Sequence, residues 1–483
     1  MTVAIKNSQA ANEAHAAKIA RDFRTQVSLP FALGLQQTIK EEEAQRRPFG
    51  RWHSPWARRL RMAVEQRGLG DFPGRFHPAG GTAAGGRGTR RLTPGIAPLG
   101  RQLALELSGL EADTITVPTD EMFDLMKWAS RGDDVYGEDQ ATNDLQDKIA
   151  KMAGKEAGLF CVSGTMTNQL AIRTHLTQPP HSIILDARSH VHLYEAGGVA
   201  MHSQASSHAV PPRNGHHLTL EEVLDNAVFG EDIHSAPTKL VSLENTLSGM
   251  VFPQEEIVRI SDCMRANGII MHCDGARMWE VVAKTGMSLE ELCRPFDTVS
   301  LCLSKGLGAP VGSILVGPRK FIEKVKWFRK AFGGGIRQCG SLSVAANYCV
   351  DNHLSKLAAT HTLASYLAQG LADLGAELLL PVETNMLWLD PSPLGFTISD
   401  LAQRAKTRGL TLGSNRIVVH LQITREAVDD LLAVVAEMKE EHKDAPNKKW
   451  IDEEQNQRFA KGTYEGAIQP PIARLGTSYG KNQ

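Results

Sequence analysis

The sequence predicts an α/β fold with a parallel or mixed sheet, followed by a smaller α+β unit. Two observations support this fold class. From Asp113 onward, short apolar runs that end in small or polar residues alternate with stretches of helical periodicity. The runs are apolar almost throughout, as expected of strands buried on both faces, and the helical stretches between them fit crossover connections.

The predicted strands follow in order through the middle of the chain: AGLFCVSG, HSIILDA, TKLVSLEN, GIIMHCDGA, FDTVSLCLSKG and GSILVG. Residues 318–370 then have a helical pattern. The smaller unit consists of ETNMLWLD, a helix ISDLAQRAKTRG, a strand NRIVVHLQI and a helix TREAVDDLLAVVAEMKEEHK. We therefore expect a large domain at 113–370, a small C-terminal domain at 371–440 and a polar tail at 441–483.

The N-terminal 112 residues have a different composition. They hold 17 Lys and Arg residues against 9 Asp and Glu residues, and lysine is absent between Arg46 and Arg101. The stretch HPAGGTAAGGRGTRRLTPGIAPLG has neither helical nor strand periodicity. We expect residues 1–112 to be an atypical, poorly ordered extension or insertion. An Arg/Gly arm for RNA is the alternative, although residues 81–101 contain no aromatic side chain that could stack on bases.

The overall composition excludes several classes of protein. The net charge of −1 gives no electrostatic reason to expect a nucleic acid or membrane partner. The seven cysteines include no CxxC pair and no zinc-ligand spacing, so we expect reduced thiols and no metal. No apolar run is long enough to span a bilayer, and the N-terminus lacks the apolar core of a signal peptide. A cytoplasmic protein fits best, with an organelle transit peptide as the alternative.

Three predicted strand ends carry residues suited to chemistry, because ligands of open α/β sheets bind beyond the carboxyl ends of the strands. The first is LFCVSGTMTNQL, where Gly164 and Thr165 begin a helix after a strand. Free backbone N–H groups and the positive end of the helix dipole would favour an anion there, such as a phosphate. Ordinary helix capping explains the same residues equally well.

The second strand end, GIIMHCDGARMWE, carries Asp274. A carboxylate at the end of a buried strand requires a partner, because leaving it unpaired is costly. Arg277, three residues later, is one candidate for that partner. The functional alternative places Asp274 beside a protonated ring nitrogen of a cofactor and Arg277 beside a neighbouring oxygen.

The third strand end carries Lys305, 31 residues after Asp274, about the length of one strand–helix–strand crossover. A lysine in this position often simply reaches solvent. Here the neighbours are small, which leaves room for a planar ring: Ser304, Gly306, Gly308, Ala309, Gly312 and Ser313. A phosphate cradle, a strand-end Asp and a strand-end Lys together predict that the chain binds pyridoxal 5′-phosphate, with Lys305 forming a Schiff base to the cofactor aldehyde.

Many segments in order resemble those of the low-specificity L-threonine aldolases, which are pyridoxal-phosphate enzymes of fold type I. These segments are GDDVYGEDQATNDLQ, GKEAGLF, SGTMTNQLA, HVHLYEAGG, LENT, DGAR, SLCLSKGLGAPVGS, FGGGIRQCG, TNM and RIVVHLQIT. The resemblance runs from about Asp113 to about Glu440. It implies a large domain with a mainly parallel seven-stranded sheet, a small C-terminal domain, and a homotetramer with active sites at the dimer interface.

The resemblance also implies roles for individual residues. Lys305 corresponds to the Schiff-base lysine, Asp274 to the partner of the ring nitrogen, and Arg277 to a residue at the ring hydroxyl. Gly164 and Thr165 correspond to phosphate-binding residues. The remaining correspondences are His190 stacked on the cofactor ring, His234 near the substrate hydroxyl, Arg337 at the phosphate of a neighbouring subunit, and Arg416 at the substrate carboxylate.

The implied reaction is retro-aldol cleavage of threonine or allo-threonine to glycine and acetaldehyde, with His190 or His234 as the base. His192 stands where the family often has an aromatic residue and is the weaker candidate. Two alternatives remain open. Racemisation of alanine or another small amino acid is known among fungal relatives within the same resemblance, and an inactive pyridoxal-phosphate-binding homologue is the other.

The sequence departs from the family pattern at its start. The family segment is like DFRSDTVT, and its serine helps to bind the substrate carboxylate, whereas this chain has LEADTIT, with Ala112 in place of the serine. The letters DFRT occur far upstream, at Asp22 to Thr25, so either a long insertion separates them or the match is coincidental. Leu247 and Ser248 also follow ENT where His and Asn are common.

Overall fold

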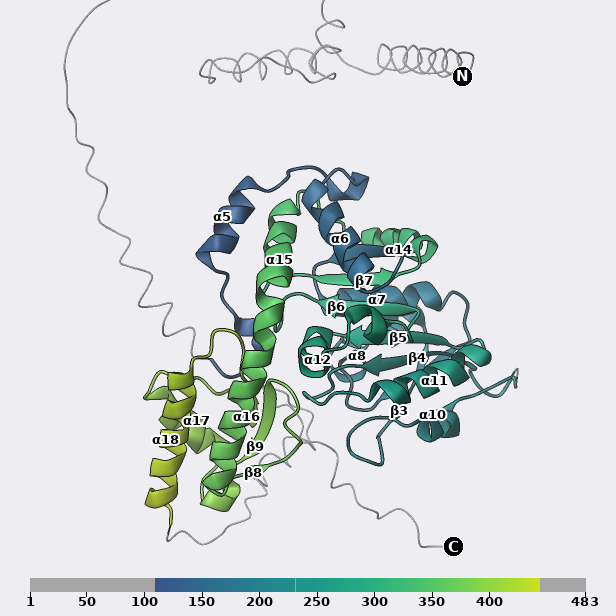
Figure 1. Ribbon diagram of the computed structural model, residues 1–483. Coiled ribbons are helices and arrows are strands. Elements are labelled where there is room, and N and C mark those ends of the chain that lie inside the picture. Colours follow the sequence, from purple (N-terminus) through teal and green to yellow (C-terminus); the bar gives the residue numbers. More distant parts are fainter. Residues whose placement is uncertain (1–108, 231, 444–483) are drawn as a thin grey trace, which may run out of the picture. The chain divides into compact units, whose positions relative to one another are not determined.

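Seven strands form a central sheet in the order β1-β7-β6-β5-β4-β2-β3 in a computed structural model, which describes residues 109–230 and 232–443 (Figure 1). Neighbouring strands are parallel except β7, which runs antiparallel to both β1 and β6. The expected large domain with a mainly parallel seven-stranded sheet is confirmed. The strands are β1 (Ala157–Cys161), β2 (Ser182–Asp186), β3 (Ser206–Val210), β4 (Thr238–Glu244), β5 (Ile270–Gly275), β6 (Thr298–Cys302) and β7 (Ser313–Gly317).

The apolar runs became strands because both of their faces are covered. Every residue of β2, β6 and β7 is buried, as continuous apolar sequence predicts. The sequence did not indicate β3, whose residues SSHAV are mostly polar and partly exposed. β3 lies at the edge of the sheet and pairs with β2 alone, so one side of it has no neighbouring strand.

Fourteen α-helices occur in the described part of the chain, and half of them begin at a capping side chain. Asp139 caps α6 by accepting a hydrogen bond from Thr142 N, and Thr219 and Ser288 form capping boxes at α10 and α13. The helices are α5 (Asp120–Trp128), α6 (Gln140–Met152), α7 (Gly164–His175), α8 (His190–Leu193), α9 (Gly198–Ser203), α10 (Leu220–Asn226), α11 (Gln254–Ala266), α12 (Met278–Thr285), α13 (Leu289–Cys293), α14 (Arg319–Ala331), α15 (Gly340–His353), α16 (Leu357–Asp373), α17 (Ile398–Lys406) and α18 (Arg425–Glu441). Short 3-10 helices occur at η1 (Asp113–Ile115), η2 (Asp134–Tyr136), η3 (Leu354–Lys356) and η4 (Ser392–Leu394).

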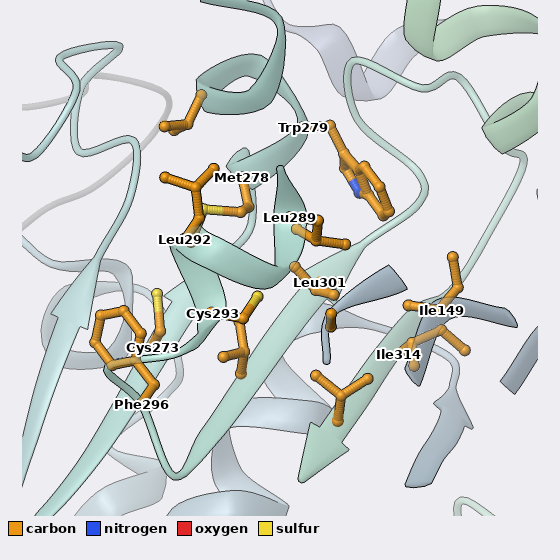
Figure 2. Packing of buried hydrophobic residues seen from close by; sticks show 14 of the residues in the cluster. Ile149, Cys273, Met278, Trp279, Leu289, Leu292, Cys293, Phe296, Leu301 and Ile314 are labelled. Atoms are coloured by element: carbon orange, nitrogen blue, oxygen red, sulfur yellow. The ribbon is translucent and has the colours of Figure 1, made fainter. Parts of the chain in front are cut away.

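The main core lies between the sheet and the helices that cover it. Figure 2 shows side chains of α12 and α13, including Met278 and Leu289, near Leu301 of β6 and Ile314 of β7. Trp279 is buried in this core, and its indole N–H donates to Cys302 O at 2.9 Å. This bond holds the last residue of β6, three positions before Lys305.

A second core belongs to the small C-terminal unit. Its antiparallel sheet, in the order β10-β9-β8, consists of β8 (Glu377–Leu378), β9 (Met386–Asp390) and β10 (Arg416–Val418). Residues of α16 and α18 pack on it, with Leu110 completing the core from the other end of the described chain. In Figure 1, α15 and α16 follow one another from the large sheet to this unit.

The predictions for residues 1–108 and for 444–483 lie outside the described residues, so the predicted extension and tail stay predictions, as do the domain boundaries. Residues 109–112 belong to the folded part: Leu110 N donates to Thr411 O, and Val418 N donates to Leu110 O, both at 2.9 Å. All seven cysteines are free thiols. No helix between residues 109 and 443, apart from the undescribed position 231, is long and apolar enough to cross a bilayer.

Candidate active site

The predicted strand-end residues meet at one edge of the large sheet. β5 and β6 are parallel neighbours, with Asp274 opposite Ser300, so the residues after both strands lie at the same carboxyl edge. Lys305 follows β6 by three residues in a turn closed by Gly308 N, which donates to Lys305 O at 2.7 Å. The order of the strands therefore places Lys305 and Asp274 after neighbouring strands at the same edge of the sheet.

Lys305 is half-buried, and its ammonium makes no hydrogen bond or ion pair with a residue that the structure describes. Burial raises the pKa values of Glu244 and Cys302, and the positive charge of Lys305 opposes this rise; the same charge helps Arg277 to lower the pKa of Asp113. An amine that is partly desolvated, unpaired and surrounded by small residues is suited to covalent chemistry with a carbonyl compound.

Asp274 is buried, and its two oxygens are held in fixed positions. Asn168 Nδ2 donates to Oδ2 at 2.8 Å, and Ala276 N donates to Oδ1 at 3.1 Å. Asn168 lies one turn after Gly164 on α7, so the helix that forms the anion cradle also orients this carboxylate. His272 Nε2 lies 3.2 Å from Asn168 Oδ1 and fixes the amide in turn.

His190 begins α8 and is hydrogen-bonded to a buried glutamate. Its Nδ1 lies 3.0 Å from Glu195 Oε1, and the other carboxylate oxygen of Glu195 accepts from Gln169 Nε2 at 2.5 Å. This hydrogen bond, with Asp274 and Glu244 adding to it, raises the pKa of His190 above its usual value against the opposing effect of burial. Ligand atoms of His190, Glu195 and Asp274 lie within 4.8 Å of one another, but the two carboxylates already accept hydrogen bonds from amides. Hydrogen bonding therefore accounts for this group without a metal.

The N-terminus of α7 provides the predicted anion cradle. Ser163 caps the helix by accepting from Met166 N at 3.1 Å, while the N–H groups of Gly164 and Thr165 donate to no residue that the structure describes. A Cβ atom added to Gly164 would lie 2.6 Å from Cys302 Sγ, so the helix start approaches the end of β6 too closely for a side chain. These two N–H groups fit a phosphate group beside Lys305.

Arg277 does not pair with Asp274, as its position in the sequence suggested it might. Its Nε and Nη2 donate to Asp113 at 2.8 and 2.7 Å instead, across 164 residues of sequence. Asp113 is fully buried, and although burial alone would raise its pKa, the charge of Arg277 holds that pKa below its usual value. Arg277 Nη1 makes no hydrogen bond with the described residues and remains for a ligand oxygen.

Arg416 begins β10 in the small unit, and its side chain lies near Arg277 and Asp113. Its Nη2 donates to Glu111 O at 3.2 Å, whereas its Nε is buried without a partner among the described residues. Burial and the nearby charge of Arg277 lower the pKa of Arg416, and Asp113 and Tyr194 act in the opposite direction. A guanidinium with unused N–H groups is a suitable binding site for a carboxylate. Ala112, in the place of the family serine, is buried and offers no side-chain hydrogen bond.

Glu244 is a site residue that sequence reasoning did not identify. It ends β4 opposite Asp274, and its Oε2 accepts from His190 N at 2.7 Å. Burial and the neighbouring charge of Asp274 raise its pKa. Asn168, Glu195 and Asp113 were also missed. Asn168 and Glu195 closely follow Thr165 and His190 in sequence, which is too weak a signal without the fold, and Asp113 lies far in sequence from every predicted site residue.

Two predicted residues are not brought to this group within one chain. The side chain of His234 is 83% exposed and pairs with Asp232, and that of Arg337 is 50% exposed and pairs with Asp133 at 2.9 Å. Their predicted roles stay predictions, and that of Arg337 was in any case for a neighbouring subunit. His192 is exposed.

Comparison with known proteins extends these findings. Residues 109–392 match the beta-eliminating lyase family. The chain is 48% identical to the probable low-specificity L-threonine aldolase of Schizosaccharomyces pombe over 67% of this chain and 85% of that protein. It is 36% identical to alanine racemase TOXG of Cochliobolus carbonum over 67% of this chain and 85% of that protein. The solved threonine aldolase of Leishmania major has the same fold, with a TM-score of 0.59 at 19% identity over 68% of this chain and 99% of that one.

Proposed function

This chain belongs to the beta-eliminating lyase family, and we propose that it is a pyridoxal-phosphate-dependent lyase that cleaves L-threonine and L-allo-threonine to glycine and acetaldehyde. The family resemblance seen in the sequence is thereby confirmed. The name of the Schizosaccharomyces pombe relative supports the substrate class. The expected cofactor is consistent with the residues of the site.

One observation carries the proposal. Lys305, Asp274 and the start of α7 converge at one sheet edge, with an unpaired amine, an oriented carboxylate and two free N–H groups. An ordinary structural site would pair these groups with one another, since leaving buried polar groups unpaired is costly. Their arrangement instead fits one ligand that has a carbonyl carbon, a basic ring nitrogen and a phosphate.

Pyridoxal phosphate, when bound, supplies an aldehyde for covalent attachment to an amine and a ring that accepts the electron pair released at Cα. Lys305 would hold the aldehyde, and Asp274 would hold a proton on the ring nitrogen. Gly164 and Thr165 would bind the phosphate through backbone N–H groups. Arg277 would contact the ring hydroxyl through Nη1, which Asp113 leaves free.

The substrate side of the site consists of Arg416 and His190. Arg416 would bind the substrate carboxylate through its unpartnered Nε and a second N–H. His190 would take the proton of the β-hydroxyl at Nε2, because Nδ1 is engaged with Glu195. We keep His234 as the second candidate base.

We further propose a cytoplasmic homotetramer with sites at the dimer interface. Two features support the interface. Large apolar side chains of α5 and η2 are exposed, with Phe123 at 55%, Trp128 at 79% and Tyr136 at 74%. Arg337 lies on the same surface as Tyr136, whose ring is 6.0 Å from the guanidinium carbon. Light scattering of the purified protein tests the assembly, and a monomer with full activity would contradict it.

Racemisation of a small amino acid is the second candidate function, because the chain is also 36% identical to a protein named alanine racemase. It requires removal of a proton from Cα on one face and return on the other, for which Lys305 and His190 suffice. The higher identity to the aldolase favours cleavage.

The deciding experiment measures acetaldehyde release from L-allo-threonine by the purified full-length protein with pyridoxal phosphate, using a coupled alcohol dehydrogenase assay. We expect release, and we expect Lys305→Ala to abolish it. Lys155→Met is the control, because Lys155 is a half-buried lysine outside the site that donates to Phe296 O. Conversion of L-alanine to D-alanine without acetaldehyde would favour the racemase, and turnover by Lys305→Ala would contradict the assignment of the site.

A further inference from the structure

Asp113 lies at the centre of the cationic groups of the candidate site, although nothing in the proposed reaction requires it to touch the substrate. We infer that Asp113 is a positioning residue that orients Arg277 and neutralises the positive charge shared by Arg277, Arg416 and Lys305. This inference rests on the proposed function. It assigns a role to the carboxylate at the very start of the large domain.

Asp113 binds the planar guanidinium of Arg277 through two hydrogen bonds and so fixes its orientation. Nε and Nη2 of Arg277 donate to the two oxygens of Asp113 at 2.8 and 2.7 Å, with side-chain exposures of 11% and 0%. A bidentate pair of this kind leaves the guanidinium no free rotation, so the remaining Nη1 points in one defined direction. A single hydrogen bond would not restrict it in this way.

The segment that carries Asp113 is anchored in the small unit on both sides. Before Asp113, Leu110 forms two backbone hydrogen bonds with Thr411 and Val418, and His420 Nε2 lies 2.8 Å from Gly109 O. After Asp113, Gln422 forms two hydrogen bonds with the backbone of Val117, at 2.9 and 2.7 Å. Asp113 therefore fixes Arg277 of the large domain relative to the segment that holds Arg416.

Other charged groups also face Lys305, but their negative charge is less available. Glu244, from β4, is used by His190 N, and burial raises its pKa. Glu280, from α12, lies against the loop that contains Gly306, because a Cβ added to Gly306 would lie 1.9 Å from Glu280 Oε1. The other oxygen of Glu280, Oε2, lies 2.6 Å from His361 Nε2 and is engaged by that histidine. Cys302 is buried, and Asp274 is directed at Asn168. Asp113 is thus the carboxylate that balances the three cations.

The test uses the protein loaded with pyridoxal phosphate and follows the visible absorbance of the bound cofactor against pH, because this absorbance reports protonation of the nitrogen that Lys305 contributes. Asp113→Asn removes a negative charge that stabilises the protonated form. We expect the pH at the midpoint of the absorbance change to fall by about one unit in this variant. We also expect its kcat for L-allo-threonine to fall at least about ten-fold. Asp113→Glu keeps the charge, so its midpoint should stay near that of the wild type while kcat falls.

Asp186→Asn is the matched control. Asp186 accepts two hydrogen bonds from the guanidinium of Arg188, at 2.9 and 2.7 Å, with side-chain exposures of 7% and 11%, so this pair has similar guanidinium geometry and burial but is not part of the proposed machinery. We expect Asp186→Asn to lower the melting temperature without moving the midpoint.

An unchanged midpoint in Asp113→Asn, with only a lowered melting temperature as in the control, would overturn the inference. If Asp113→Asn does not fold, Asp113→Glu decides, because kcat equal to that of the wild type would show that the bidentate geometry is not needed. If the wild type binds the cofactor but cleaves no β-hydroxy amino acid, the proposed substrate is wrong, and the midpoint comparison still tests Asp113.

Discussion

His190, the first residue of α8, is hydrogen-bonded to Glu195, which follows that helix, with His190 Nδ1 3.0 Å from Glu195 Oε1. The side chain of Glu195 is fully buried, and the amides of Asn168 and Gln169 donate to it as well. This pairing orients the imidazole and engages Nδ1, which leaves Nε2 as the other ring nitrogen. It also raises the pKa of His190, so the glutamate controls both the direction and the basicity of the candidate base.

Glu195→Gln should therefore move the acid limb of the pH profile of kcat/KM to lower pH. Without the carboxylate charge the pKa of His190 falls, and neutral imidazole persists to lower pH. At neutral pH we expect activity to fall roughly ten-fold, because the imidazole loses its orientation. The measurement is acetaldehyde release across a series of buffers.

Glu383→Gln serves as the control for this prediction. Glu383 Oε1 lies 3.0 Å from His216 Nε2, so the control breaks a similar His–Glu pair that is not part of the proposed machinery. An acid limb that stays in place in Glu195→Gln, or that moves equally in Glu383→Gln, would show that the His190–Glu195 bond does not govern catalysis.

Arg416→Lys should raise KM for L-allo-threonine at least about ten-fold with a smaller effect on kcat. The guanidinium can offer a carboxylate two parallel N–H groups, whereas lysine offers a single point charge. The buried, unpartnered Nε of Arg416 is the group whose loss we expect to matter. Arg425→Lys, at an exposed arginine of α18 that pairs with Asp429, controls for the change of residue type. Equal KM values in the wild type and Arg416→Lys would remove Arg416 from the carboxylate site.

Gly164→Ala should weaken cofactor binding. The added Cβ would lie 2.6 Å from Cys302 Sγ, which forces α7 away from β6 and displaces the free N–H groups of the cradle. We expect the dissociation constant of the apoprotein for pyridoxal phosphate to rise at least about ten-fold in a fluorescence titration. Combining it with Cys302→Ala removes the atom that the new Cβ meets and should restore part of the affinity. A double variant as weak as Gly164→Ala alone would show that the steric explanation is wrong.

The sequence predicted the centre of the site because the relevant residues follow buried strands. Lys305 and Asp274 each end an apolar run, and parallel neighbouring strands bring such residues to the same edge of a sheet. Gly164 was recognisable as the start of a helix after a strand. These features depend on local sequence and on the most regular part of the fold.

The rest of the site depends on contacts that local sequence does not encode. The pairing of Arg277 with Asp113 spans 164 residues, and proximity in sequence favoured Asp274 as the partner. Glu195 contributes through the Asn168 and Gln169 amides of α7, which only the packing of α7 against the loop after α8 reveals. His234 and Arg337 remain predictions because, within one chain, both side chains are exposed and pair with Asp232 and Asp133.

Two histidines behind the site, the buried His272 and the half-buried His175, should make the protein sensitive to acid. His272 lies between Thr298 and Asn168, at 2.9 and 3.2 Å, and burial lowers its pKa to about 4, while burial lowers the pKa of His175 to about 3. In the unfolded chain both would take up a proton near pH 6.5. The unfolded state therefore binds more protons between about pH 6.5 and 4, and the folding stability falls as the pH decreases through this window.

His272→Asn removes one of these groups, so the free energy of unfolding should depend less steeply on pH between about 6 and 4.5, by about one proton. At pH 7 the variant should be less stable by about 1–3 kcal/mol, because asparagine cannot reach both Thr298 and Asn168. Adding His175→Asn should reduce the slope by about one further proton. Urea unfolding at a series of pH values gives these slopes. A variant with the slope of the wild type would mean that His272 is already protonated in the folded protein, and that its hydrogen bonds to Asn168 and Thr298 do not hold it neutral behind Asp274.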